Sequence, residues 1–62
     1  MGPIDILTVA QVAKIIQFTP KGVYGLVEQG VIPYIRISNR IRFLQTDVLA
    51  WLQQNRVPVK KR

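Results

Sequence analysis

Apolar residues recur at helical spacing in the first stretch of the chain. Four of them lie three or four positions apart: Val9, Val12, Ala13 and Ile16. This spacing predicts a helix over residues 9–17. Thr8 and Gln11 have the spacing of a capping box, in which each side chain accepts a hydrogen bond from the other residue's backbone N–H. A helix this short must be stabilised by tertiary packing.

The same periodicity restarts after a short interruption. Thr19 is a good N-cap and Pro20 suits the first helical position, where its missing N–H would be unpaired anyway. An apolar stripe follows at Val23, Leu26 and Val27, and Gly30 suits the helix end. The pattern predicts a second helix over residues 20–29. With residues 17–19 as a tight connection, the two helices predict a helix-turn-helix.

The period changes to two between residues 33 and 44, which predicts a β-hairpin around Ser38 and Asn39. A two-residue loop would place Ile37 opposite Arg40 and mix apolar and basic side chains on one face. A three-residue loop pairs Ile37 with Ile41 and places Arg36 opposite Arg42. Because register decides which face every side chain occupies, we expect the three-residue loop, with Asn39 in the left-handed conformation.

A third helix is predicted from an N-cap at Thr46, with Asp47 in the first turn and an end near residues 54–55. Trp51 lies on its apolar stripe and is expected in the core rather than at an interface. Leu49 lies off that stripe. It is either a contact for a partner or a lone exposed side chain, which needs no special role. The expected organisation is a flexible or extended lead (1–6), one domain (7–55) and a flexible basic tail (56–62).

Helix, turn, helix, hairpin and helix is the element order of a winged helix-turn-helix, an α+β fold that is mainly α. Residues 7–52 resemble the excisionase-type (AlpA-like) branch of the MerR-like winged helix-turn-helix superfamily. The matching residues occur in every predicted element: Leu7, Thr8, Val9, Val12, Ala13, Val23, Tyr24, Leu26, Val27, Gly30, Ile32, Pro33, Ile35, Arg36, Ile37, Arg40, Ile41, Arg42, Phe43, Asp47, Val48, Ala50, Trp51 and Leu52. The resemblance implies double-stranded DNA binding. Members often carry Arg at the position of Gly25, so this chain lacks that base contact. Members also often carry Gly-Gly at the position of Ser38 and Asn39.

Composition narrows the function further. The 62 residues include nine Lys or Arg but only three Asp or Glu, giving a net charge of +6. The absence of Cys and His excludes disulfides, the common zinc sites and the usual general base. We therefore expect no enzyme activity, no cofactor and no metal. No apolar run reaches the roughly 18 residues of a membrane span. A cytoplasmic protein, nucleoid-associated when it binds DNA, is expected.

The second helix is the expected recognition helix, because its N-terminal half enters the major groove in helix-turn-helix proteins. Lys21 would reach a guanine edge or a phosphate, and Thr19 with the first helical N–H groups would bind a phosphate. Tyr24 would contact a phosphate through its hydroxyl. Gly22 and Gly25 form a strip without side chains, which fits either close approach to DNA or close packing against protein.

The wing supplies the second expected contact. Arg40 at the loop would enter the minor groove, while Arg36 and Arg42 would flank the DNA backbone. The alternative is a solvated charged face. Two like charges directly opposite each other are unfavourable without a counter-ion, which favours the DNA contact. The basic residues Lys60, Lys61 and Arg62 would add non-specific attraction to phosphates.

Two functions share these contacts. An excisionase (a recombination directionality factor of a phage or mobile element) would bind and bend attachment-site DNA to help an integrase. Its partners would be that integrase and neighbouring protomers bound side by side, the free protein being a monomer. The alternative is a small AlpA/MerR-like transcriptional regulator. A third possibility, of another class, is an adaptor whose basic face binds an acidic protein.

Overall fold

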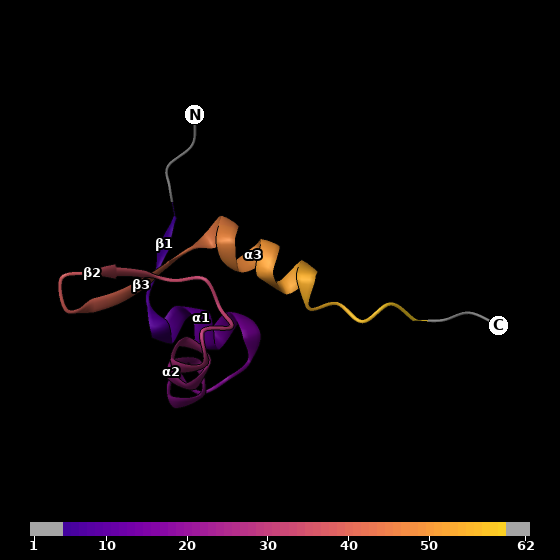
Figure 1. The fold of residues 1–62 in the computed structure, drawn as a ribbon, viewed down its shortest axis with the longest axis horizontal. Coiled ribbons are helices and arrows are strands. Elements are labelled where there is room, and N and C mark those ends of the chain that lie inside the picture. Colours follow the sequence, from indigo (N-terminus) through magenta and orange to yellow (C-terminus); the bar gives the residue numbers. More distant parts are fainter. Residues whose placement is uncertain (1–4, 60–62) are drawn as a thin grey trace.

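The fold is that of the expected winged helix-turn-helix. The computed structural model describes residues 5–59, and within them the order is β1 (Ile6–Leu7), α1 (Val9–Ile16), α2 (Pro20–Gln29), β2 (Ile35–Ile37), β3 (Arg40–Leu44) and α3 (Gln45–Gln54). Figure 1 shows the β2–β3 hairpin projecting away from the helices, opposite the chain that follows α3. The α+β, mainly α class is therefore confirmed.

The N-terminus of α1 carries the complete capping box. The Thr8 Oγ1 accepts from the Gln11 N–H at 3.2 Å, and the Gln11 Oε1 accepts from the Thr8 N–H at 2.8 Å. The helix ends one residue earlier than predicted, because Gln17 adopts a left-handed conformation with φ 60°. The N–H of Phe18 then donates to the Ala13 carbonyl at 2.7 Å, which turns the chain toward α2.

Both ends of α2 agree with the sequence. Thr19 caps the helix, Pro20 opens it, and Gly30 ends it with φ 70°. Val23 and Val27 face the core, and α1 contacts α2. The predicted helix-turn-helix is thus present with its three-residue connection.

A three-stranded antiparallel sheet has the order β1-β3-β2. Its first strand contains Ile6, which we expected only in the flexible or extended lead, and Leu7, the first residue of the expected domain. Ile6 pairs with Leu44, and Leu7 with Phe43. The N–H of Gln45 also donates to the Asp5 carbonyl at 2.9 Å. This pairing ties the start of the described chain to the strand that leads into α3.

The predicted hairpin register is wrong. Ser38 and Asn39 form a two-residue loop, which pairs Ile37 with Arg40. Ser38, rather than Asn39, has the positive φ of 56°. A positive φ at the first loop residue alone is the pattern of a type II′ turn, a favoured two-residue hairpin loop.

The physical reason is that β2 is an edge strand that lies beyond the core. The cross-strand partners of β2 are Ile35 with Arg42, and Arg36 with Ile41. Of the two hairpin strands, only β3 contributes apolar side chains to the core, through Phe43 and Ile41. The expected pairing of Ile35 with Phe43 is therefore unnecessary, and the preferred short loop sets the register.

Helix α3 begins at Gln45, so the predicted N-cap at Thr46 is also wrong. The N-cap residue is Leu44, and its side chain makes no capping hydrogen bond. Strand β3 runs directly into the helix, and the Asp5 carbonyl accepts the Gln45 N–H instead of a capping side chain. Asp47 does lie in the first turn, where the helix dipole favours a negative charge.

The core is built from eight buried apolar side chains contributed by all three helices, the α2–β2 connection and β3: Val9, Val12, Ala13, Val23, Val27, Ile32, Phe43 and Val48. Phe43, at 0% exposure, is the largest fully buried one. Burying each Val or Phe contributes roughly 1.5–3 kcal/mol. The core thus fixes the helix-turn-helix and the base of the hairpin in one unit.

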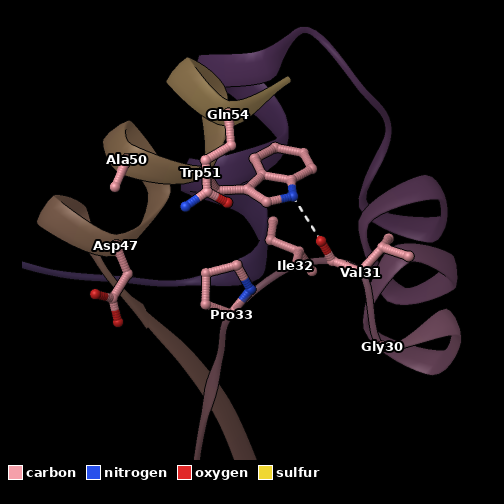
Figure 2. Close-up of a pocket in the computed structure, with 8 residues that line it drawn as sticks. All are labelled: Gly30, Val31, Ile32, Pro33, Asp47, Ala50, Trp51 and Gln54. Atoms are coloured by element: carbon pink, nitrogen blue, oxygen red, sulfur yellow. Dashed lines mark hydrogen bonds between the residues drawn. The ribbon is translucent and has the colours of Figure 1, made fainter. Parts of the chain in front are cut away.

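Trp51 joins α3 to the connection between α2 and β2. It is half-buried, packs against the core, and its Nε1–H donates to the Val31 carbonyl. Figure 2 shows the indole reaching across a groove of about 390 Å³ from α3 toward Val31. Trp51 is therefore a bridge at the edge of the core rather than a fully buried side chain.

Candidate nucleic-acid interface

The face of α2 turned away from the core carries few side chains. Opposite Val23 and Val27 lie Lys21, Gly25 and Glu28, which are at positions one turn apart. Lys21 and Glu28 are exposed. Tyr24 lies at the edge of this face, with half of its surface exposed to solvent. A ligand that approaches α2 would thus meet one cation, one carboxylate, a phenol and bare backbone.

The N-terminus of α2 offers less to an anion than the sequence implied. Pro20 has no N–H, and the Gly22 N–H already donates to Thr19 Oγ1 at 3.0 Å. The Val23 N–H donates to the Thr19 carbonyl at 3.0 Å. In the described chain, this leaves the backbone N–H of Lys21 as the first-turn donor still available. The hydroxyl hydrogen of Thr19 remains a second donor beside it.

The two glycines of α2 differ in their surroundings. A Cβ on Gly25 would meet no atom within 4 Å, so protein packing within the described chain does not explain this glycine. A Cβ on Gly22 would lie 3.1 Å from Phe18 Cδ2 and 3.3 Å from Thr19 Oγ1. Gly22 therefore fits the packing alternative, and Gly25 fits close approach of an external ligand to the backbone.

Arg36 and Arg42 lie on opposite faces of the hairpin, although the predicted register placed them opposite each other on one face. Arg40 and Arg42 are two residues apart on β3 and lie on one face of the sheet. Arg36 lies on the other face, opposite Ile41 rather than Arg42. The expected repulsion between directly opposed Arg36 and Arg42 therefore does not occur. Instead, the hairpin presents positive charge on both faces.

Arg40 and Arg36 are exposed, whereas Arg42 is half-buried. The Nη1 of Arg42 donates to the Ile41 carbonyl at 2.8 Å, which holds this guanidinium along the strand. Arg40 follows the turn directly and is the cation nearest the tip of the hairpin. The guanidinium of Arg42 is thus held along the strand, whereas Arg36 and Arg40 are exposed to solvent.

Sequence reasoning missed the composition of the solvent-facing side of the sheet. We call this the outer sheet face, defined by the cross-strand partners that point away from Phe43: Ile6, Ile35, Ile37, Arg40, Arg42 and Leu44. None of its aliphatic members packs against the core, and Ile6 and Ile37 are both 51% exposed. The signal for it was the two-residue loop at Ser38 and Asn39, whose register mixes isoleucines with arginines.

Helix α1 fixes the relation between α2 and the hairpin, because it contacts both α2 and β3. In Figure 1 the hairpin and α2 lie on the side of the molecule away from the chain after α3, and the hairpin extends past α2. The structure therefore gathers the candidate contacts into two groups. One is on α2 (Thr19, Lys21, Gly22, Tyr24 and Gly25), and the other is on the hairpin (Arg36, Arg40 and Arg42).

Other candidate residues lie elsewhere. Leu49 is half exposed on α3, as its position off the apolar stripe indicated. Lys60, Lys61 and Arg62 lie outside the described residues. Residues 5–59 contain no group of three or more His, Cys, Asp or Glu side chains able to hold a metal ion. None of the helices in that range is long and apolar enough to cross a membrane.

Comparison with known proteins identifies the fold's family. A family model described as a helix-turn-helix domain matches residues 6–56. No curated protein and no solved structure matches the chain. The matched residues include α1, the turn, α2, the hairpin and α3. Because the match covers most of the chain, the protein belongs to the helix-turn-helix domain family and is a DNA-binding protein of that fold.

Proposed function

We propose that the protein is an excisionase, a recombination directionality factor that binds and bends the attachment-site DNA of a phage or mobile element. The observation that carries this proposal is the contrast between a recognition helix with few base-reading side chains and a hairpin with arginines on both faces. Such a surface grips the phosphate backbone more strongly than it reads sequence.

In this proposal the N-terminal half of α2 lies in the major groove. Lys21 contacts a guanine edge or a phosphate, and its backbone N–H and the Thr19 hydroxyl point at one phosphate oxygen. The Tyr24 hydroxyl donates a hydrogen bond to a neighbouring phosphate. The open space at Gly25 lets the helix backbone approach the groove closely, with Gly22 supporting the helix start against Phe18.

The hairpin then lies along the minor groove. Arginines on opposite faces of a wing can reach the two phosphate strands that wall the groove. Arg36 would reach one strand and Arg42 the other, while Arg40 at the tip enters the groove itself. This arrangement supports a bend, because contact with both walls favours a changed groove width. The bent DNA would help an integrase assemble, with neighbouring protomers bound side by side.

A small AlpA/MerR-like transcriptional regulator is the second candidate. Glu28 favours it, because a carboxylate on the outward face of α2 can accept a hydrogen bond from cytosine N4. Together with Lys21 it would give α2 two base-reading side chains and a defined operator. The two candidates use the same fold and differ in the DNA they occupy.

A DNase footprint on the attachment and promoter regions of the protein's own genetic element tests the proposal. We expect protection of repeated sites beside an attachment site, altered mobility of circularly permuted fragments that carry them, and loss of excision on gene deletion. Protection of one isolated promoter, with excision unaffected by deletion, would instead establish the regulator.

A further inference from the structure

We infer that Ile37 is an apolar wedge that enters between base pairs at the floor of the minor groove and kinks the DNA. The inference rests on the proposed position of the hairpin in that groove. Proteins that bend DNA from the minor groove frequently insert an aliphatic side chain into a base step, which unstacks it and produces a kink of about 20–90°.

The position of Ile37 is the first argument. It is the last residue of β2, directly before the turn, and 51% of its surface is exposed. It is absent from the side chains that pack on the core. The two-residue turn and the pairing with Arg40 hold its backbone, and a β-branched side chain has few rotamers. Ile37 is therefore a rigid aliphatic group at the projecting end of the molecule.

The charge around Ile37 indicates what it contacts. Arg36 precedes it, Arg40 is its cross-strand partner, and Arg42 lies further along the same face. An apolar surface of a partner protein would have to desolvate these guanidinium groups. In the minor groove, by contrast, phosphates flank the groove and stacked bases form its floor. Arginines around a central isoleucine match that distribution of charge and apolar surface.

Ile35 supports the same placement one step back from the tip. It lies on the outer sheet face beside Ile37, is half-buried, and pairs with Arg42. It would contact the deoxyribose wall of the groove while Ile37 reaches the base step. A wedge also creates sequence preference without hydrogen bonds, because pyrimidine–purine steps are easily unstacked. We expect such a step under the tip of the hairpin.

The test uses the full chain and a duplex of about 30 base pairs that carries the footprinted site. Donor and acceptor dyes at the two ends report the bend, and 2-aminopurine at each pyrimidine–purine step reports unstacking. The wild type should shorten the end-to-end distance and raise fluorescence at one step. Replacing that step by a stiff A-tract step should weaken binding roughly tenfold.

Three variants separate the wedge from other effects. Ile37→Thr keeps a β-branched residue in the strand but should abolish the fluorescence rise and reduce the bend. Ile37→Leu should retain both. Ile6→Thr is the matched control, because Ile6 is equally exposed on the outer sheet face but lies on β1. It should bind and bend DNA like the wild type.

The outcomes distinguish this inference from the proposed function. If Ile37→Thr bends the DNA and unstacks the step as the wild type does, the wedge is refuted and the proposed bending function stands. If the wild type binds its site without any bend, both are refuted. Loss of bend in Ile6→Thr as well would also refute the wedge, because the effect would then belong to the whole outer sheet face.

Discussion

Three residues with positive φ mark the places where the described chain changes direction: Gln17 (60°) after α1, Gly30 (70°) after α2, and Ser38 (56°) in the hairpin turn. Glycine adopts this conformation without strain, whereas other residues lose roughly 1–2 kcal/mol there. Only one of the three positions is occupied by glycine. Gln17 and Ser38 are therefore sites where the domain can be stabilised.

Ser38→Gly should increase the free energy of unfolding by about 0.5 kcal/mol, because relief of backbone strain exceeds the extra entropy of glycine in the unfolded chain. In a domain of this size the melting temperature would rise by about 2–4 °C. Thermal unfolding followed by circular dichroism measures it. Gly30→Ala is the matched reverse change and should cost about 1 kcal/mol. A lower melting temperature for Ser38→Gly would contradict the turn assignment.

Gly25→Ala should affect the free protein and the DNA complex in opposite directions. A Cβ at Gly25 has open space, so alanine should stabilise the free protein by about 0.5–1 kcal/mol through helix propensity. The same methyl group should weaken DNA binding if the α2 backbone approaches the groove closely. Melting curves and a DNA titration give the two effects.

Gly22→Ala is the internal comparison for that experiment. Its Cβ would lie 3.1 Å from Phe18 Cδ2, so the ring must move and the gain in stability should be smaller. Unchanged DNA affinity in Gly25→Ala would show that α2 does not approach the DNA closely, and the glycine would then have no DNA-related role.

At the scale of elements, local signals predicted the helices better than the hairpin. Thr8, Thr19 and Gly30 act within a single turn of chain, and each occupies the predicted cap position. The hairpin register depends on which strand faces the core, and this is a property of the sheet order. Since β2 is an edge strand beyond the core, alternation alone could not place Ile37. The N-terminus of α3 was misplaced because it also depends on a contact that is distant in sequence. The Asp5 carbonyl accepts the Gln45 N–H in place of a capping side chain.

Trp51 tests how α3 is attached to the rest of the domain. Trp51→Phe keeps an aromatic ring but removes the Nε1–H that donates to the Val31 carbonyl, and should cost about 0.5–1.5 kcal/mol. Trp51→Ala should cost about 3 kcal/mol, the low end for a core aromatic, because the side chain is only half-buried. Chemical denaturation measures both. Leu49→Ala, half exposed on the same helix, should change stability by less than about 0.5 kcal/mol. Equal stability of Trp51→Phe and wild type would show that the hydrogen bond from Trp51 to the Val31 carbonyl does not stabilise the attachment of α3.

At the scale of the whole molecule, the sequence predicted the fold class and the basic surface, but not how the charge is distributed. A net charge of +6 favours a polyanionic partner. Arg36 and Arg42 were expected opposite each other on one face, and the structure places them on opposite faces. Charge counts are available from composition, whereas the direction of each side chain requires the register. The contact roles proposed for α2 and the hairpin remain predictions.

The salt dependence of DNA affinity tests whether the protein contacts the DNA mainly through its phosphates. A plot of log affinity against log salt concentration should have a slope of about −4 to −6, near −0.9 for each phosphate contact. Arg40→Ala should lower affinity, reduce the slope by about 1 and leave the melting temperature unchanged, since Arg40 is exposed. Fluorescence anisotropy with a labelled duplex measures these values. Absence of measurable duplex affinity at low salt would favour an adaptor that binds an acidic protein.

Strand β3 has a consequence for mechanical coupling. This single segment begins at Arg40 beside the hairpin tip, passes through fully buried Phe43, and continues without a loop into α3. At about 3.4 Å per residue, this strand spans roughly 17 Å and is anchored in the core by Phe43. In the proposed complex, a force that bent DNA applies to the tip is resisted by the packing around Phe43. Any substitution that loosens this packing should weaken the bend before it unfolds the protein.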